Sequence, residues 1–356
     1  MKSIVLTGAK KFEIQDIPKP RIQSDHDVLL KIAVVGICGS DIHYYAEGRI
    51  GDQIVTYPFT IGHECSAIVE AVGKEVTQVK PGDRISVDPT ISCGQCDQCM
   101  TGRTHTCRNQ KFLGCPGQMS GCLSEYITMP EKCCFKVGDN ISLTQAALIE
   151  PLSIGAYAVS LLKNKKPKTV GILGVGPIGL SVLLACKQVG IESIFVTDKI
   201  DHRLQEARRI GASWTGNPDR LNMGEEREVN SLDVVFECCG QQDALDQAID
   251  ILKPGGELLI VGIPESDRIS FDIHLLRRKE IDIQNVRRQN GFIQTAIDWV
   301  QQGLVEIDFM ATHHYDLEQV KSAFEIVKNY RDGVIKAMVY PAGIEVKPCE
   351  QERVTG

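Results

Sequence analysis

A glycine-rich hexapeptide constrains the fold of this chain more than any other segment. It follows an apolar run, Thr169 to Leu173, directly, and it opens an apolar helical pattern that continues from Pro177 to Val189. In this context glycines allow a sharp turn, a close approach of the backbone to a pyrophosphate and tight packing of helix on strand. A turn with only a structural role is the alternative. We predict a dinucleotide site formed by Gly174, Gly176, Pro177, Ile178 and Gly179, with Val175 between the first two glycines.

Strand and helix patterns continue to alternate after the hexapeptide. The predicted strands are Ser193 to Thr197, Leu232 to Glu237, Glu257 to Val261 and Ile281 to Val286, and the predicted helices are Asp201 to Ile210 and Asp243 to Leu252. Such alternation is typical of a parallel sheet with helices on both faces. We therefore expect an α/β protein whose second half is a doubly wound nucleotide-binding domain.

The chain before this region has a different texture. Short apolar runs broken by Gly, Pro and Asp occur at Val28 to Ile37, Ser66 to Val72, Arg84 to Val87 and Cys122 to Met129. This pattern predicts a small antiparallel β domain, with a tight turn at Lys80-Pro81-Gly82-Asp83.

Two amphipathic helices and a closing strand are expected after Asn290. The helices run from Gly291 to Gln302 and from Leu317 to Tyr330, and the strand runs from Ile335 to Tyr340. The polar tail after Pro341 is expected to be frayed.

The choice of cofactor depends on Asp198. It ends the strand after the glycines, about 20 residues on, where a carboxylate can accept hydrogen bonds from both ribose hydroxyls. A 2′-phosphate would meet a like charge there, so NAD is favoured over NADP. The nearby cations Lys199 and Arg203 weaken this preference. We include Arg203 among the cofactor-binding residues. The alternative for Asp198 is a cap on the helix that begins near Asp201.

Four closely spaced cysteines predict a structural metal site. Cys93, Cys96, Cys99 and Cys107 lie within fifteen residues, in a loop without apolar periodicity. Four thiolates can close a tetrahedron around one zinc ion and leave no open position. An iron–sulfur cluster and free thiols are the alternatives.

A second, dispersed set of residues predicts a catalytic metal. Cys38, His63 and a carboxylate at Glu64 or Glu150 make a three-ligand set, which leaves a fourth position for water or substrate. Each of these residues alone would more often be an ordinary buried side chain.

These segments resemble the medium-chain zinc-dependent alcohol dehydrogenase superfamily over nearly the whole chain. The resemblance is carried by "VVGICGSDIHYY", "IGHECSAIVEAVG", "VKPGDRI", "CGQCDQCMTGRTHTC", "IEPLSIGAYAV" and "GILGVGPIG". The sorbitol (polyol) dehydrogenase branch is most similar, through "GSDIHYYAEGRIGDQIVTYP", "ALIEPLSIGAYA" and "VTDKIDHRL".

The resemblance implies a domain organisation and an assembly. It implies a GroES-like β catalytic domain at residues 1–156 with a structural zinc lobe at about 90–110, a Rossmann NAD-binding domain at 157–289, and a return to the catalytic domain at 290–356. It also implies a homo-oligomer, a tetramer or a dimer.

The resemblance further implies roles for individual residues. Cys38, His63 and Glu64 would hold the catalytic zinc, with Glu150 beside it, bonding through a water or entering the shell in turn. The alcohol dehydrogenase branch has a second cysteine in the place of Glu150.

The implied substrate pocket contains Ser40, His43, Tyr44 and Arg287. Polyol dehydrogenases usually follow that arginine with an aromatic residue, whereas this chain has Arg288. Arg287 pairing with a carboxylate at a subunit interface is the alternative role, and packing on the cofactor is the alternative for His43.

The predicted reaction is hydride transfer between a polyol or secondary alcohol and NAD. We expect two zinc ions per chain, the catalytic one acting as a Lewis acid on the alcohol oxygen. The proton would leave through Glu150 and a water or through Ser40 and His43. Because the ligands Cys38 and Glu64 are anionic, a neutral polyol is expected to bind better than an acid. The alternatives are a threonine-type amino-alcohol dehydrogenase and a non-catalytic zinc-binding structural protein of the same fold.

Charge and hydropathy exclude several other classes of partner. The formal net charge is -7, and no run of Lys and Arg suggests a surface for nucleic acid or acidic membranes. No stretch of about 18 apolar residues predicts a membrane span, and the N-terminus lacks a secretory apolar segment. A cytoplasmic location is therefore expected as the default. Fourteen cysteines in such a chain more often mean metal ligation or reduced thiols than disulfides.

Overall fold

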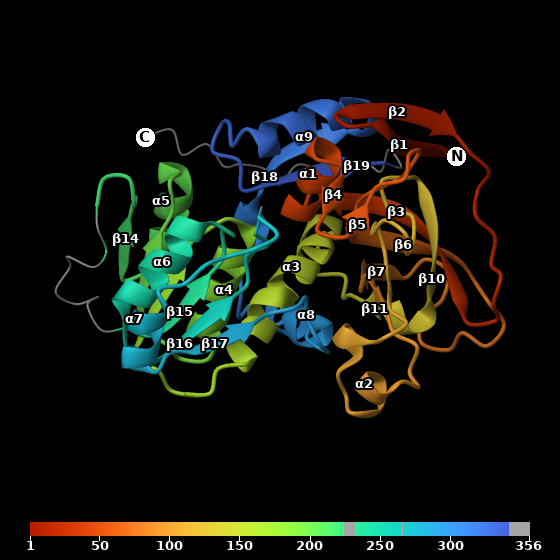
Figure 1. The fold of residues 1–356 in the computed structure, drawn as a ribbon. Coiled ribbons are helices and arrows are strands. Elements are labelled where there is room, and N and C mark those ends of the chain that lie inside the picture. Colours follow the sequence, from red (N-terminus) through yellow and green to blue (C-terminus); the bar gives the residue numbers. More distant parts are fainter. Residues whose placement is uncertain (222, 224–231, 265, 342–356) are drawn as a thin grey trace, which may run out of the picture.

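Two sheets lie side by side in this protein, with one long helix between them (Figure 1). The structure, a computed structural model, describes residues 1–221, 223, 232–264 and 266–341. The tail after Pro341, predicted to be frayed, lies outside the described residues.

One sheet is six-stranded and entirely parallel, with the strand order β14-β13-β12-β15-β16-β17. The strands are β12 (Thr169–Leu173), β13 (Ser193–Thr197), β14 (Trp214–Gly216), β15 (Leu232–Glu237), β16 (Leu252–Ile260) and β17 (Asp282–Asn285). The helices around them are α4 (Pro177–Gln188), α5 (Asp201–Arg209), α6 (Gln242–Ile251) and α7 (Ile273–Lys279). The chain enters this sheet at the central strand β12. It continues first to the edge strand β14 and then, through β15 and β16, to the opposite edge strand β17, which confirms the predicted doubly wound fold.

The inner strands of this sheet are buried on both faces. Every residue of β15 is buried, as are Val170 to Leu173 of β12. Helices cover both sides of a parallel sheet, so its central strands are nearly continuous apolar runs without polar alternation. This burial explains why the sequence shows short apolar blocks at these positions.

The other sheet contains seven strands in the order β11-β7-β6-β3-β19-β18, with β10 also paired to β3. Its strands are β3 (Asp27–Gly36), β6 (Glu64–Val72), β7 (Arg84–Val87), β10 (Tyr126–Pro130), β11 (Cys134–Lys136), β18 (Ala311–Asp316) and β19 (Lys336–Tyr340). All pairings are antiparallel apart from β18 with β19. The predicted antiparallel domain thus gains one parallel edge, because the late segments β18 and β19 join a sheet begun by β3.

Smaller elements surround this second sheet. They are the hairpin β1 (Lys2–Gly8) and β2 (Lys11–Asp16), the ribbons β4 (Arg49–Ile50) with β5 (Gln53–Ile54) and β8 (Thr90–Ile91) with β9 (Lys111–Phe112), and the helices α1 (Gly39–Ala46), α2 (Asp97–Met100), α8 (Ile293–Gln301) and α9 (Val320–Lys328). The predicted turn at Lys80 to Asp83 is present between β6 and β7, where the Asp83 N–H donates to the Lys80 carbonyl over 3.0 Å.

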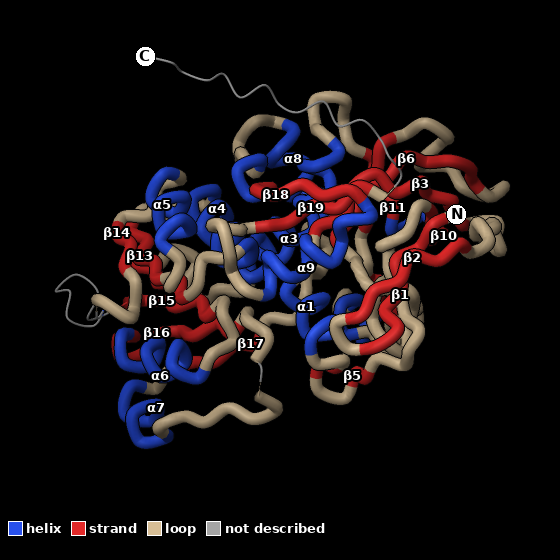
Figure 2. The backbone as a smooth tube through the Cα atoms, turned by 90° about the horizontal axis from the view of Figure 1, so that it is seen from above, coloured by secondary structure: helices blue, strands red, loops and turns tan. Residues whose placement is uncertain are grey.

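The helix between the sheets is α3 (Leu143–Ser160), and both views place it at the centre of the molecule (Figures 1 and 2). Ser142 caps it by accepting a hydrogen bond from the Gln145 N–H over 3.0 Å, and Gln145 bonds back to the Ser142 N–H. The helix packs on α4 on one side and on β3, β6 and β7 on the other. It therefore joins the two halves and carries Glu150 to the junction between them.

Within the described residues, no helix combines the length and the apolar character that crossing a membrane requires.

Candidate active site and metal centres

Three ligand-type side chains from different parts of the sequence converge beside the junction of the two halves. The Sγ of Cys38, a ring nitrogen of His63 and a carboxylate oxygen of Glu64 all lie within 4.8 Å of one another. Cys38 follows β3 at the start of α1, while His63 and Glu64 stand at the start of β6. Because β3 and β6 are paired antiparallel, the end of one strand lies opposite the beginning of the other.

Gly36 makes room for this convergence. It pairs with Glu64 across the sheet, and a Cβ atom at Gly36 would lie 2.6 Å from the Glu64 Oε2. A side chain as small as alanine would thus displace the carboxylate.

His63 is oriented by Asp41, a residue to which the sequence analysis gave no role. The Asp41 Oδ1 lies 3.4 Å from the His63 Nδ1, and the Asp41 carboxylate also accepts from the N–H groups of Cys38 and Gly62. Burial alone would lower the pKa of His63, but the negative charges of Asp41 and Cys38 outweigh burial and raise it. A carboxylate at Nδ1 leaves Nε2 free to bind a metal. The sequence signal was Asp41 itself, inside the quoted segment "GSDIHYY".

Glu64 is held by Lys336, a second residue that the sequence analysis missed. The Lys336 Nζ lies 2.7 Å from Oε1 and 2.6 Å from Oε2 of Glu64, and it also donates to the Ile37 carbonyl. Both side chains are fully buried, with exposed fractions of 2% and 1%. A single lysine inside the apolar strand β19 was the available signal, because a charge is buried in such a strand only when it is paired.

Glu150 lies beside the three converging groups and is not one of the set within 4.8 Å. Its Oε2 is buried and has no hydrogen-bond partner among the described residues. Burial raises the pKa of Glu150 to about 8, and the charges of His63 and Glu64 also act on it. A buried carboxylate oxygen without a partner is costly unless a metal, a water or a substrate satisfies it.

These residues fit a catalytic zinc ion. Sulfur, imidazole nitrogen and carboxylate oxygen are donors that zinc accepts, and three protein ligands leave a position open. The unpartnered oxygen of Glu150 adds an acceptor next to that position.

Three of the four residues expected around the substrate, Ser40, His43 and Tyr44, lie on α1, next to the converging groups. Ser40 is half-buried, and His43 lines a surface hollow together with Glu47 and Arg49 of its own half and Pro264 and Asp267 of the other half. An ion pair of 2.6 Å joins Arg49 to Asp267 across this hollow.

Tyr44 is buried, and its hydroxyl donates to the Gln53 Oε1 over 2.8 Å. The same hydroxyl lies 3.9 Å from the Sγ of Cys115. Burial raises the pKa of Tyr44, so this side chain stays a neutral hydrogen-bonding group.

The two consecutive arginines differ in exposure. Arg287, which was expected to contact substrate, is exposed, whereas Arg288 is turned inward. The Arg288 guanidinium stacks on Phe112, with its Cζ 3.4 Å from the ring centroid, and its Nη1 donates to the Gln110 Oε1. Burial and the neighbouring Arg287 lower the pKa of Arg288 to about 10.

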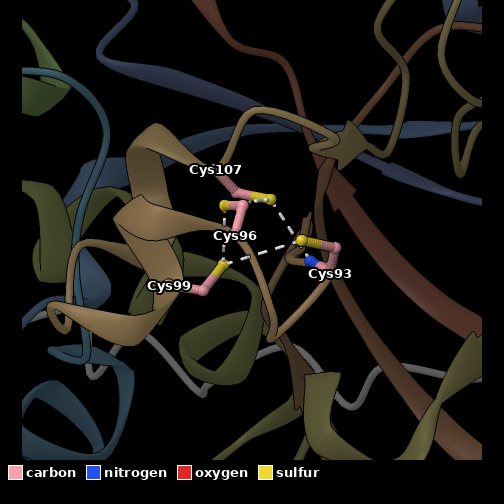
Figure 3. Close-up of side chains that lie close together, drawn as sticks. All are labelled: Cys93, Cys96, Cys99 and Cys107. Atoms are coloured by element: carbon pink, nitrogen blue, oxygen red, sulfur yellow. Dashed lines mark hydrogen bonds between the residues drawn. The ribbon is translucent and has the colours of Figure 1, made fainter.

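The four cysteines of the predicted structural site come together in one lobe (Figure 3). The Sγ atoms of Cys96 and Cys99 are 3.6 Å apart, those of Cys96 and Cys107 are 3.8 Å apart, and those of Cys93 and Cys99 are 4.0 Å apart. Zinc–sulfur bonds of about 2.3 Å place the sulfurs of a tetrahedral site roughly 3.8 Å apart. The lobe therefore has the size that a zinc ion requires.

Charge in the lobe also favours a cation. Backbone N–H groups of Gln95 and Cys96 lower the pKa of Cys93 to about 6, while burial and neighbouring thiols raise the pKa of Cys99 to about 11. Four thiolates at these distances repel one another, so a dication is needed to hold them all deprotonated.

The glycine hexapeptide connects β12 to α4 as predicted. Gly174 has a φ of +87°, and a Cβ at Gly179 would lie 1.9 Å from the Gly174 carbonyl oxygen, so neither position accepts a side chain. Gly176 caps α4, which begins at Pro177, with Ile178 in its first turn. The order of the strands reverses between β12 and β15, and this is where nucleotides bind in such sheets.

Asp198 lies next to the glycines and does not cap α5. Its Oδ2 accepts from the Val175 N–H and its Oδ1 from the Ile200 N–H, both over 2.8 Å. The N-cap of α5 is Ile200, without a side-chain cap bond. The alternative in which Asp198 is the helix cap is therefore wrong.

Arg203 is buried at the junction of the two halves. Its Nε and Nη2 donate to the Val334 carbonyl over 3.1 and 2.8 Å, and its Nη1 lies near Gly176. The side chain expected to help bind the cofactor thus joins α5 to the segment before β19.

Known families and relatives agree with this architecture. A family model described as an alcohol dehydrogenase GroES-like domain matches residues 24–139, and one described as a zinc-binding dehydrogenase matches residues 177–302. Sorbitol dehydrogenase of Bacillus subtilis (strain 168) is 37% identical over 345 residues, which cover 96% of this chain and 97% of the relative. L-idonate 5-dehydrogenase of Vitis vinifera is 33% identical over 330 residues, which cover 90% of this chain and 89% of the relative.

Solved structures show the same fold. The crystal structure of an oxidoreductase of unknown specificity from Escherichia coli has a TM-score of 0.89 and 31% identity, and the match covers 96% of this chain and 99% of that one. A zinc-binding dehydrogenase from Sinorhizobium meliloti 1021, bound to NADP, has a TM-score of 0.86 and 28% identity, with coverage of 96% and 99%. An alcohol dehydrogenase from Escherichia coli CFT073, complexed with NADH, has a TM-score of 0.86 and 29% identity, with the same coverage. Together with the strand order, these matches confirm a GroES-like β domain combined with a Rossmann-type α/β domain.

Proposed function

Since the chain belongs to the medium-chain zinc-dependent alcohol dehydrogenase superfamily, in its polyol dehydrogenase branch, we propose that it oxidises a secondary hydroxyl of a polyol with NAD. The reverse reaction reduces the corresponding ketone. The observation that carries this proposal is the convergence of Cys38, His63 and Glu64 at a buried point of the GroES-like half.

Cys38, His63 and Glu64 would hold the catalytic zinc ion, with Glu150 beside it. When bound there, zinc supplies Lewis acidity that eases the loss of a proton from the substrate hydroxyl. Asp41 keeps the His63 ring oriented, and Lys336 keeps the Glu64 carboxylate in place and limits its charge. The unpartnered carboxylate oxygen of Glu150 is the group that we propose takes the proton. Ser40 and His43 form the alternative route.

The Rossmann-type half would bind the cofactor. Backbone N–H groups at the start of α4 can bind the pyrophosphate, because a helix N-terminus attracts anions. NAD, when bound, accepts the hydride from the carbinol carbon. Asp198 already lies at the glycine loop, where its negative charge would disfavour a 2′-phosphate. Related structures hold NADP and NADH, so this preference rests on Asp198.

Cys93, Cys96, Cys99 and Cys107 would hold the structural zinc ion.

The proposed domain boundaries are 1–156, 157–289 and 290–356. We also propose that the protein forms a homo-oligomer, either a dimer or a tetramer. None of the thirteen described cysteines forms a disulfide, which supports the proposal of a reducing compartment such as the cytosol.

A threonine-type amino-alcohol dehydrogenase is the second candidate. The inward position of Arg288 favours it, because an amino acid substrate needs a cation for its carboxylate. The convergence of Cys38, His63 and Glu64 next to Glu150 argues against a non-catalytic zinc-binding protein, because a structural role does not require an open metal site beside an unpartnered carboxylate.

The test is a panel of polyols and amino alcohols with NAD and NADP, combined with zinc analysis. We expect reduction of NAD by a polyol and two zinc ions per chain, one of which is removed by mild chelation together with the activity. Cys38→Ser should lose that ion. One zinc ion per chain that Cys38→Ser leaves unchanged would refute the catalytic assignment.

Cofactor choice is tested separately with Asp198→Ala and Asp198→Asn. Both variants should lower the preference for NAD over NADP by about tenfold or more, because the charge facing the ribose is lost. An unchanged preference would show that another residue reads the ribose.

A further inference from the structure

We propose that Arg288 forms an anion-binding subsite in the substrate pocket, so that the preferred substrate is a hydroxylated chain with a carboxylate or phosphate at one end. The inference rests on the proposed function and specifies the class of substrate. It reverses the expectation of a neutral polyol, which considered only the charges of the metal ligands.

The position of Arg288 connects it to the catalytic residues through one aromatic ring. Phe112 packs on the ring of His63, with a centroid separation of 5.3 Å, and it also packs under the Arg288 guanidinium at 3.4 Å. Cys115, Tyr44 and Glu150 lie near enough to Arg288 to influence its pKa. A six-carbon chain with bonds of about 1.5 Å is roughly 6 Å long. We infer that such a chain, with one hydroxyl at the catalytic residues, directs its anionic end group towards Arg288.

Arg288 has unused hydrogen-bond donors. A guanidinium offers five N–H groups, and in the described part of the chain the one acceptor that bonds to it is the amide oxygen of Gln110. No Asp or Glu among the described residues forms an ion pair with Arg288, whereas the buried Lys336 has Glu64. A half-buried guanidinium without a carboxylate partner is a site for an incoming carboxylate or phosphate, which can accept two parallel N–H bonds.

The backbone supports this inward direction at some cost. Arg288 has a φ of +54°, a left-handed backbone conformation that residues other than glycine rarely adopt. The next two side chains hold the turn in place: Gln289 donates to the Asp88 Oδ2 over 2.9 Å, and Asn290 donates to the Gly102 carbonyl over 2.8 Å. Strain maintained by such neighbours is typical of functional positions.

The cysteine lobe contributes to the same subsite. Gln110, which holds Arg288, follows Cys107 and donates from its Nε2 to the His105 carbonyl over 3.0 Å. A folded lobe thus fixes the acceptor that orients the guanidinium.

The test compares L-idonate and galactitol 1-phosphate with D-sorbitol as probes, using the zinc-loaded full chain. We expect kcat/KM for at least one anionic probe to exceed that for D-sorbitol by tenfold or more. The better of the two anions distinguishes a carboxylate from a phosphate as the natural group. Equal or better turnover of D-sorbitol would overturn the inference while leaving the proposed function intact.

Variants separate substrate binding from a structural role. Arg288→Met should lower kcat/KM for the anionic probe by about a hundredfold, with little change for D-sorbitol, because only the anion loses a partner. Arg288→Lys keeps the charge and should retain part of the preference. The matched control is Arg278→Met, which removes an exposed arginine of α7 outside the proposed site and should leave the preference unchanged. An equal loss for all probes in Arg288→Met and Arg288→Lys would overturn the inference.

Calorimetric binding supplies a readout that does not need turnover. The anionic probe should bind the zinc-loaded protein more tightly than D-sorbitol, and Arg288→Met should abolish the difference. If no probe is turned over but this difference is found, the subsite stands and the proposed reaction fails. If no difference in binding is found, the subsite is refuted.

Discussion

At the scale of single residues, the site depends on side chains that hold the metal-binding groups in place. The Glu64 carboxylate has two roles. It pairs with the buried ammonium of Lys336, and it faces the point where Cys38 and His63 converge. A buried carboxylate and a buried ammonium each lose hydration, so neither is stable in this position without the other. The lysine therefore positions a metal ligand.

Lys336→Met should destabilise the protein strongly once the site metal has been removed by chelation. We expect a loss of about 3–5 kcal/mol in the free energy of unfolding, because Glu64 is left buried and unpaired. Urea denaturation measures this change. The double variant Lys336→Met with Glu64→Gln should recover much of the stability. Lys136→Met is the control, since the pair of Lys136 with Asp83 is exposed on the lysine side and should be worth about 1 kcal/mol or less. A small effect of Lys336→Met in the chelated protein would contradict the assigned role.

Gly36→Ala should impair the metal site while leaving the fold intact. The added Cβ would lie 2.6 Å from the Glu64 Oε2, so the carboxylate must move away from Cys38 and His63. We expect the zinc affinity and kcat/KM to fall by about 10- to 100-fold, as when groups that orient ligands are altered. Metal analysis and kinetics measure this. Gly39→Ala is the matched control, because a Cβ at Gly39 meets nothing within 4 Å and its φ is not positive. Equal effects of the two variants would show that the contact with Glu64 is unimportant.

At the scale of elements, helix α3 and the cysteine lobe show two different relations between sequence and structure. The lobe was recognised from its spacing alone. Helix α3 was not predicted, because residues on all of its sides are buried and its sequence has no amphipathic period. Because the helix is buried between the two halves, it has no polar face of the kind by which a surface helix is identified in a sequence.

Cys96→Ser should remove the lobe zinc and leave the catalytic one. The Cys96 Sγ is 3.6 Å from Cys99 and 3.8 Å from Cys107, so its loss opens the tetrahedron. Zinc content should fall from two ions per chain to one, and the free energy of unfolding should fall by roughly 4 kcal/mol, as expected when a structural metal is lost. Cys239→Ser, at an exposed thiol outside the lobe, should change neither. Two zinc ions per chain in Cys96→Ser would contradict the assignment.

At the scale of the whole molecule, the two halves share residues as well as a boundary. Strand β19 comes from the end of the described chain and lies beside β3, and the segment that precedes it accepts the Arg203 guanidinium of the Rossmann-type half. The Arg49–Asp267 pair also joins the halves, but both side chains are about half exposed, so water and salt weaken it.

Arg203→Met should loosen the docking of the two halves. Two N–H bonds from a buried charged group to the Val334 carbonyl are lost, and hydrogen bonds to charged groups contribute about 1.5–3 kcal/mol each. We expect the free energy of unfolding to fall by about 2–3 kcal/mol. KM for NAD should change less than in Asp198→Ala. Arg208→Met, which removes an exposed arginine of the same helix with one hydrogen bond to Thr215, is the control and should cost less stability. A large change in KM for NAD or NADP with unchanged stability would instead support the predicted role of Arg203 in cofactor binding.

The sequence by itself determined the features that depend on neighbouring residues. The parallel sheet, the glycine turn at Gly174 to Gly179 and the cysteine spacing from Cys93 to Cys107 follow from local periodicity, backbone preference and ligand spacing. These signals extend over at most one strand, one turn and one helix, so they are present in the sequence before any tertiary contact forms.

Only the tertiary structure decided which distant groups meet and which way a side chain turns. Lys336 pairs with Glu64 across 272 positions, and Arg288 rather than Arg287 points inward because its turn is fixed by contacts with Asp88 and Gly102. Pattern analysis gives no distance between such residues. Burial and long-range packing set those distances, and with them the charge of the pocket.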